Sequence, residues 1–286
     1  MALSARTPST LVTNYFIPTI YSNEVEKAAK SQLVTWDSIN SSWKKQLVKG
    51  NILNIPKSTL VTATEVVVGT VATGVNPMNT TGVQLTINQW YEALCKLDTM
   101  SLKQEGTNLE TIAVGESAYA IAKQIDTSVC ALFSALNGST VLGTDGVAIT
   151  DDLLETLMET LMEADVPWEA ADLSCILDPS GVADMCKIDK FISSQYAQTG
   201  VLKNGLVGSS PIYGWKVKTT NNLAAATTGN YAAVLHRRAI GGAAQIEKSW
   251  RKDFPELHQI YMSAEALWGV IEVMDTFGIP CYTRKS

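Results

Sequence analysis

Residues 173–186, LSCILDPSGVADMC, place an acid and a serine directly after an apolar run. An acid at the end of a buried strand is a usual catalytic position in an α/β enzyme, so Asp178 or Ser180 could serve a hydrolase or transferase. However, no histidine lies nearby in the sequence to activate Ser180. Asp at the N-cap followed by Pro is also a preferred helix start. We therefore interpret Asp178 first as a helix cap.

The histidines and cysteines are too scattered to form a recognised site. His236 and His258 lack metal-type spacing, and the sequence contains no nucleophile elbow and no phosphate-binding loop motif. The cysteines are odd in number and include no C-x-x-C pair, which favours small buried side chains in a reducing compartment over a disulfide framework. They are Cys95, Cys130, Cys175, Cys186 and Cys281.

A row of acidic residues follows Thr150 on a predicted helix, where the glutamates are four residues apart and line one solvated face. The row is Asp151, Asp152, Glu155, Glu159 and Glu163. The glycine-rich loop before Thr150 could offer amides to an anion, but Asp145 and the first acids of the row would repel it. We therefore predict no catalytic, cofactor-binding or metal-binding residues, and no cofactor.

The composition excludes several classes of protein. Of the 286 residues, 46% are apolar and 17% are charged, which suits a chain of about two domains with a sizeable core. The formal net charge of −6 and the lack of a long Lys/Arg run do not predict tight nucleic-acid binding. Residues 1–12 lack the apolar core of a signal peptide, and no segment approaches the ~20 apolar residues of a membrane span.

The first part of the chain predicts extended segments. Residues 1–46 are polar with one helix at 22–35, which indicates an arm that packs on another body. Apolar side chains alternate along 48–70 and 83–98, which predicts a long two-stranded ribbon, and a helix through 88–97 is the competing interpretation. Such a ribbon is marginal alone in water, so we expect neighbouring subunits to cover it.

A spine helix and an inserted α/β unit follow. Three-and-four spacing over 107–137 predicts a helix about 45 Å long that stops at Asn137-Gly138. The insert, residues 145–225, begins with a helix that Thr150 caps and Pro167 ends. Its other elements are a strand at 173–177, helices at 179–186 and 188–196, and a strand at 212–220.

The last part of the chain returns to strands. They are predicted at 231–236, 242–250 and 257–274, with 247–256 as an exposed charged turn. We expect these strands to pack on the spine helix, so that the insert interrupts one domain. The predicted order is arm, β-ribbon, spine helix, α/β insert and strands.

Five stretches resemble tailed-phage major capsid proteins, which have the Hong Kong ninety-seven-type capsid fold. Residues 49–57, KGNILNIPK, are similar to the motif that starts the family's extended loop, and 118–133, AYAIAKQIDTSVCALF, resemble its spine helix. Residues 173–185 resemble the central-domain strand and helix, 208–222 the following turn and strand, and 233–245 the returning strand. Each motif is weak alone, but the five occur in order over most of the chain.

The resemblance implies an α+β fold and no enzyme activity. Its segments would be an N-terminal arm (1–48), an extended β-hairpin E-loop (49–88), a P-domain with the spine helix and β-sheet (89–145), an α/β A-domain (146–225) and the returning P-domain strands (226–286). Some family members crosslink a lysine of the E-loop to an asparagine of the P-domain. Lys57 can be compared with that lysine, but no partner is assigned.

The implied function is self-assembly into pentamers and hexamers of an icosahedral head shell that encloses the double-stranded DNA genome of a tailed bacteriophage. The implied partners are other copies of the chain, a scaffolding protein, a portal and a decoration protein, with weak contact to DNA and no membrane. No long prodomain precedes the arm, which favours a separate scaffolding protein. The expected location is the virion, after assembly in the host cytoplasm.

Three other interpretations stay open. An encapsulin-type shell has the same fold but encloses a cargo enzyme instead of a genome. An α/β hydrolase or transferase would be a small oligomer and would lose activity on Asp178→Asn. A phage tail or decoration protein should lack the long central helix.

Overall fold

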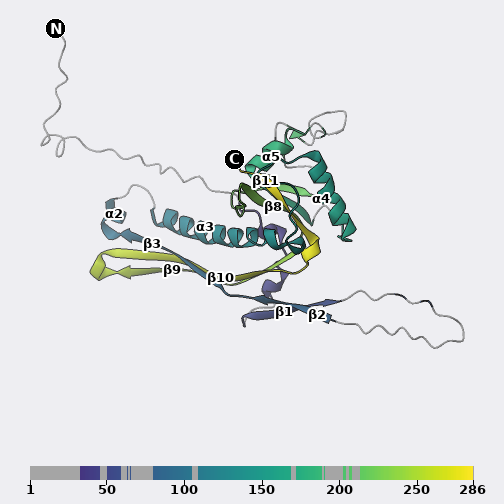
Figure 1. Cartoon of the computed structure of the whole chain (residues 1–286). Coiled ribbons are helices and arrows are strands. Elements are labelled where there is room, and N and C mark those ends of the chain that lie inside the picture. The colour runs from purple at the N-terminus through teal and green to yellow at the C-terminus, as the bar shows by residue number, and fades with distance from the viewer. Residues whose placement is uncertain are drawn as a thin grey trace, which may run out of the picture.

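The computed structural model contains helices and strands in one mixed α+β arrangement, as expected from the sequence. Figure 1 shows a long helix above a sheet of long strands, a second sheet with helices at one end, and a hairpin below. The structure describes residues 33–45, 50–58, 63, 65, 80–104, 109–168, 172–188, 190, 202–203, 206–207 and 213–285.

Strands outnumber helices in the described part of the chain. The strands are β1 (Ile52–Ser58), β2 (Thr80–Thr86), β3 (Gln89–Asp98), β4 (Leu173–Leu177), β5 (Leu202–Lys203), β6 (Leu206–Val207), β7 (Lys216–Thr219), β8 (Gly229–His236), β9 (Ile240–Phe254), β10 (Gln259–Glu272) and β11 (Gly278–Arg284). The α-helices are α2 (Thr99–Gln104), α3 (Leu109–Cys130), α4 (Asp151–Glu163) and α5 (Pro179–Met185).

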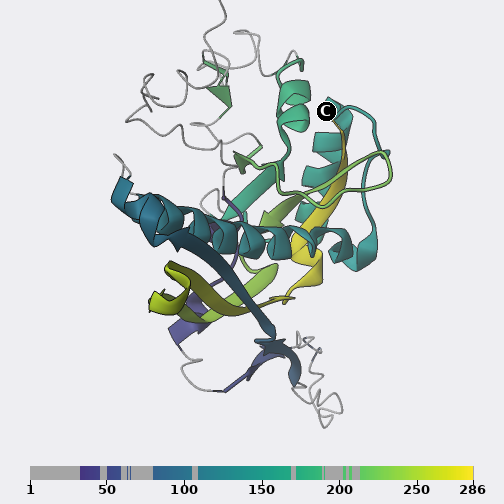
Figure 2. The same ribbon diagram turned by 90° about the vertical axis from the view of Figure 1, so that its left-hand side faces the viewer.

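The long helix α3 packs on a three-stranded antiparallel sheet of order β3-β10-β9. Side chains alternate along these strands, so one face of the sheet meets the helix. Ile121 of α3 lies with Ala244, Ala266 and Trp268 in one buried cluster. Figure 2 shows the helix lying across these strands. The predicted packing on the spine helix is confirmed for β9 and β10, whereas β8, the strand predicted at 231–236, is part of the second sheet.

The second sheet has four strands in the order β11-β8-β4-β7. Strand β4 lies inside it, parallel to β7 and antiparallel to β8, and all five of its residues are buried. Helix α4 packs its leucines on this sheet, around the fully buried Trp215. Strands β8 and β11 come from the C-terminal part of the chain, so residues 226–286 contribute to both sheets. The five segment bounds stay a prediction.

The predicted ribbon is confirmed in part within the described residues. There, strand β1 pairs with β2 over Ile52–Ser58 and Thr80–Thr86. The strand predicted over 83–98 breaks after Ile87, and β3 pairs with β10 instead. The break has a physical reason, because Ile87 and Leu85 are buried against the β9–β10 part of the molecule. The competing helix through 88–97 is wrong, and most of residues 59–79 lie outside the described residues.

The spine helix is also shorter than predicted. It ends at Cys130, so it is about 33 Å long at 1.5 Å per residue. Beyond it, two 3₁₀ turns bury Phe133 and Leu136, and these side chains continue the apolar spacing that predicted a longer helix. Asn137 and Gly138 have φ of 54° and 60°, so the expected left-handed stop exists, but it terminates these turns.

Smaller differences occur in the other elements. The charged residues 247–256 are not a turn, because β9 continues to Phe254 and the hairpin reverses at Pro255–Leu257. The observed β7, β8 and β10 match the predicted strands with shifted ends. The helix predicted at 22–35 falls mostly outside the described residues, and its last three residues are not helical. The helix predicted at 188–196 also lies mostly outside them.

Candidate functional site

Asp178 acts as a helix cap, as the sequence predicts. It is 3% exposed, and its Oδ1 accepts a hydrogen bond from the Gly181 amide at 2.9 Å. Its Oδ2 lies 2.5 Å from Ser180 Oγ and accepts from Asn230 Nδ2 at 3.2 Å. Ser180 Oγ is also 2.5 Å from the carbonyl oxygen of Arg284. Both candidate catalytic groups therefore hold helix α5 against the end of β11.

The two histidines are not placed to activate Ser180. His236 pairs with Leu173, at the opposite end of β4 from Asp178, and the five residues from Leu173 to Asp178 span roughly 16 Å at about 3.3 Å per residue. Its Nδ1 accepts from the Arg238 amide at 3.2 Å, and its ring packs edge-on against Phe277. His258 lies at the hairpin tip between β9 and β10, with φ of 52°. The structure therefore does not bring together a nucleophile and its base from these residues.

The cysteines and acids do not form a metal centre in the part of the chain that the structure describes. All five cysteines are free, and burial with the nearby charge of Asp178 raises the pKa of the Cys281 thiol to about 12. Such a thiol stays protonated and unreactive at neutral pH. No helix in the described residues is long and apolar enough to cross a membrane.

The acidic row on α4 serves as a surface ion-pair site. Thr150 caps the helix as predicted, accepting from the Leu153 amide at 3.4 Å. Lys190 pairs with Asp151 and, at 2.6 Å, with Glu155. In the preceding loop, Asp145 accepts from the amides of Thr228 and Gly229 at 2.9 and 2.7 Å. The Asp145 carboxylate therefore joins the glycine-rich loop to the start of β8.

A strap, defined as residues 33–45, runs between the two sheets and is purple in Figure 2. Asn40 donates its amide to the Ile240 carbonyl at 3.0 Å and accepts from the Gly242 amide at 3.0 Å. Trp43 lies so close to Gly241 that an added Cβ would come within 2.3 Å of its ring. The adjacent glycines Gly241 and Gly242 of β9 therefore leave the space that side chains of the strap occupy.

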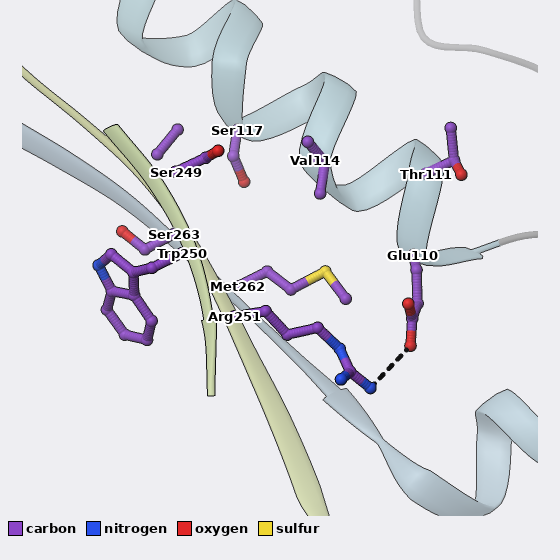
Figure 3. A pocket seen from close by; sticks show the side chains of 10 residues that line it. Glu110, Thr111, Val114, Ser117, Ser249, Trp250, Arg251, Met262 and Ser263 are labelled. Atoms are coloured by element: carbon purple, nitrogen blue, oxygen red, sulfur yellow. Dashed lines mark hydrogen bonds and ion pairs between the residues drawn. The ribbon is translucent and has the colours of Figure 1, made fainter. Parts of the chain in front are cut away.

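A groove runs along the spine helix beside the strap. One part has a volume of about 490 Å³ and is lined by small and apolar residues, among them Leu33, Ala118, Ala122 and Ala264. The adjacent part, about 390 Å³, is shown in Figure 3. There Met262 and Arg251 point toward α3, and Arg251 pairs with Glu110 at 3.3 Å. The groove contains no cluster of catalytic groups.

Exposed apolar side chains gather on the three-stranded sheet, its hairpin tip and the neighbouring elements. The largest exposure on β3 is at Trp90, 69%, and Leu94, 54%. Others in this half of the molecule are Ile52, Tyr91, Met100, Val114 and Leu257. Strand β3 pairs only with β10 within the described residues, so its outer edge is unpaired there. Exposed apolar side chains beside an unpaired strand edge are typical of surfaces that other molecules cover. The sequence alternation of β3 predicted its strand but not which face stays exposed.

No protein-family model matches the chain, and no curated protein matches it. Solved structures do match over nearly the whole length. A protein of Mycobacterium phage Che8 is 20% identical, with a TM-score of 0.79 over 94% of this chain and 97% of the other. A protein in the capsid of cyanophage P-SCSP1u is 17% identical, with a TM-score of 0.73 over 99% and 100%. A protein in the head of Helicobacter pylori bacteriophage KHP40 is 12% identical, with a TM-score of 0.71 over the full length of both chains. The chain therefore has the Hong Kong ninety-seven-type capsid fold.

Proposed function

We propose that this chain is a major capsid protein, which assembles into the head shell of a tailed bacteriophage. The observation that carries the proposal is the full-length match to proteins of phage capsids and heads. Matches of this kind cover all parts of the fold, including the hairpin, the spine helix and both sheets. The encapsulin alternative is not favoured, because the similar structures named above come from phages.

The surface of the subunit supports self-association. A monomeric protein rarely leaves a contiguous apolar patch and a long strand edge open to water. On the edge strand β3, the apolar side chains of Trp90 and Leu94 are more than half exposed. A standard contact between subunits buries on the order of 1,600 Å². We infer that copies of this chain cover the three-stranded sheet in pentamers and hexamers.

The parts of the subunit take the roles that the resemblance implies. By the predicted bounds, the hairpin β1–β2 belongs to the E-loop and α3 with the three-stranded sheet to the P-domain. Helices α4 and α5 with strands β4 and β7 belong to the A-domain, and β8 and β11 are returning P-domain strands. A scaffolding protein, a portal and a decoration protein are further expected partners. We expect assembly in the host cytoplasm and only weak contact with packaged DNA.

The proposed function needs no catalysis. Asp178 and Ser180 are engaged in capping α5, and the buried Cys281 thiol is protonated at neutral pH. Lys57 lies on β1 and is half-buried. No crosslink partner is assigned to it.

The test is to express the chain alone and together with the proteins encoded beside it. Particle mass is measured by light scattering, and particles are viewed by negative-stain electron microscopy. Closed shells or rings of five and six subunits are the expected result. A monomer or dimer at every concentration, unchanged by a scaffolding partner, would overturn the proposal. A cargo enzyme inside the purified shells would favour the encapsulin alternative.

A further inference from the structure

Asp126 is a buried carboxylate on the spine helix with no role in the proposed function. It is 2% exposed. Its Oδ1 accepts from the amide of Thr35 at 3.0 Å and from the hydroxyl of the same residue at 2.5 Å. Its Oδ2 accepts from Asn222 Nδ2 at 2.8 Å and from Thr220 Oγ1 at 3.3 Å. The four donors come from two segments, one before and one far after the helix in sequence.

Hydrogen bonds alone compensate this charge within the described residues. None of the ion pairs formed there includes Asp126. Moving a carboxylate out of water is costly, and four donors restore the interactions that water would supply. Hydrogen bonds to an ionised acceptor are about twice as strong as neutral ones. A buried acid held in this way strongly favours one arrangement of the segments that donate to it.

The donors on Oδ2 belong to the end of the four-stranded sheet. Thr220 follows β7, and its amide donates to the Leu177 carbonyl at 3.0 Å. The Asn222 amide in turn donates to Thr220 Oγ1 at 3.2 Å. Asp126 itself lies on α3, which packs on the other sheet. One carboxylate therefore links the two halves of the subunit directly.

The donor on Oδ1 belongs to the strap, and a second contact holds the strap nearby. Lys218 of β7 donates to Ser38 Oγ at 2.8 Å and to the Val34 carbonyl at 3.4 Å. Beyond this point the strap pairs with β9 through Asn40. The strap thus touches the helix, the four-stranded sheet and the three-stranded sheet within a few residues.

We propose that Asp126 is a positioning residue that locks the strap, the spine helix and the end of β7 into one joint. Because the joint spans both sheets, it fixes the angle between them. This second consequence rests on the proposed function: in a shell, the angle within each subunit contributes to curvature, so Asp126 influences particle size.

Hydrogen–deuterium exchange on the unassembled full-length chain tests the joint. Asp126→Ala is expected to speed exchange of peptides covering 33–40 at least tenfold, while peptides covering β4 keep their protection. Asp152→Asn removes one exposed acidic charge on α4 and is the matched control. It should change the exchange rate neither at 33–40 nor in β4. Unaltered exchange at 33–40 in a folded Asp126→Ala variant would overturn the proposal.

Two milder variants keep the test decisive if Asp126→Ala does not fold. Thr35→Val removes one donor from the strap, and Asn222→Ala removes one from the other side. The first is expected to speed exchange mainly at 33–40, and the second mainly at 220–224. Exchange that rises equally across the whole chain in both variants would contradict a local joint.

The particle-size consequence is tested separately with Asp126→Asn, which keeps the shape of the side chain. Wild-type and variant shells are compared by the distribution of particle diameters in electron micrographs. A broader or shifted distribution for the variant is expected. Identical distributions, together with faster exchange at 33–40, would overturn the link to curvature but not the joint. If the wild-type chain forms neither shells nor rings, even with a scaffolding partner, the proposed function fails, and the exchange experiment still decides on the joint.

Discussion

The two sheets of this subunit bury their side chains to different extents. In the four-stranded sheet, β4 is buried along its whole length, and Trp215 beside it is fully enclosed. In the three-stranded sheet, β3 alternates between half-buried and exposed residues, and Trp90 is 69% exposed. The first sheet is covered by elements of its own chain. The second leaves part of its surface exposed within the described residues.

This difference separates the residues needed for folding from those available for association. Burying apolar surface within one chain stabilises the subunit itself, whereas exposed apolar surface gains free energy only when another molecule covers it. Substitutions in the four-stranded sheet should therefore change unfolding. Substitutions on the exposed part of β3 should change assembly and leave unfolding nearly unaltered.

A pair of tryptophan substitutions tests the separation most strongly. Trp215→Ala is expected to lower the free energy of unfolding by about 3–5 kcal/mol, because it empties an enclosed site. Trp90→Ala is the matched control, with an expected change within about 0.5 kcal/mol. Denaturant unfolding of the unassembled chain measures both. Equal losses would mean that the two sheets do not differ in the way described.

Removing the cap of α5 should have a smaller effect within the same well-covered half. Asp178→Ala is expected to cost about 0.5–2 kcal/mol of unfolding free energy, since the Gly181 amide loses its acceptor. Thr150→Ala removes the longer, more exposed cap of α4 and should cost less. Thermal and denaturant unfolding compare the two. A larger loss of unfolding free energy with Thr150→Ala than with Asp178→Ala would contradict the expectation that a buried cap stabilises its helix more than an exposed one.

A charge on the exposed face of β3 should affect association more than folding. Leu94→Glu is expected to change the free energy of unfolding by no more than about 0.5 kcal/mol, because the side chain is 54% exposed. Shell yield in sedimentation should nevertheless fall. Leu94→Met, which keeps the apolar character, serves as the control. Normal shell yield with Leu94→Glu would show that this face stays uncovered in the particle.

The smallest expected effects are in the pH dependence of stability, and they have opposite signs in the two halves. Burial by itself would raise the pKa of Asp184, but hydrogen bonds from Arg284 and Lys187 outweigh it and lower that pKa. Burial raises the pKa of Glu272 at the end of β10, and Asp275 raises it further. Asp184 therefore adds stability that is lost as the pH falls below about 4, and Glu272 reduces stability as the pH rises above about 4.

Unfolding across a pH series checks these signs. The deficit of Asp184→Asn relative to wild type should shrink as the pH falls below about 4. The stability of Glu272→Gln relative to wild type should increase as the pH rises from about 4 to 7. Parallel curves for wild type and either variant would mean that the ionisation of that residue does not matter for folding.

The sequence predicted best what depends on neighbouring residues. The strand 173–177, the helix after Asp178 and the Thr150 cap follow from short-range patterns, and the structure confirms them. The end of the spine helix was missed because 3₁₀ turns continue its apolar spacing. The role of Asp126 was also missed. Its partners are 91, 94 and 96 residues away in sequence, and no local signal reports such distances.

Strand pairing shows the same limit. Alternation identified β3 as extended, yet nothing within residues 83–98 states that its partner is β10 and not the strand before it. The exposed face of β3 likewise depends on where α3 packs. Resemblance to a known fold predicted the architecture more reliably than local patterns did, because a known fold specifies which distant segments pair and pack.

The order of strands in the four-stranded sheet also has a consequence for when the subunit can be completed. Strand β4 is fully buried, but β8, which covers one of its edges, begins more than 50 residues later, at Gly229, and β11 ends at Arg284. During synthesis, the strap and hairpin therefore leave the ribosome long before this sheet can close. A growing chain has its contact surfaces exposed while its own core is unfinished. A rigid four-stranded sheet therefore cannot form before the residues of β11 have been synthesised, so the strand order delays completion of the fold until that strand has emerged.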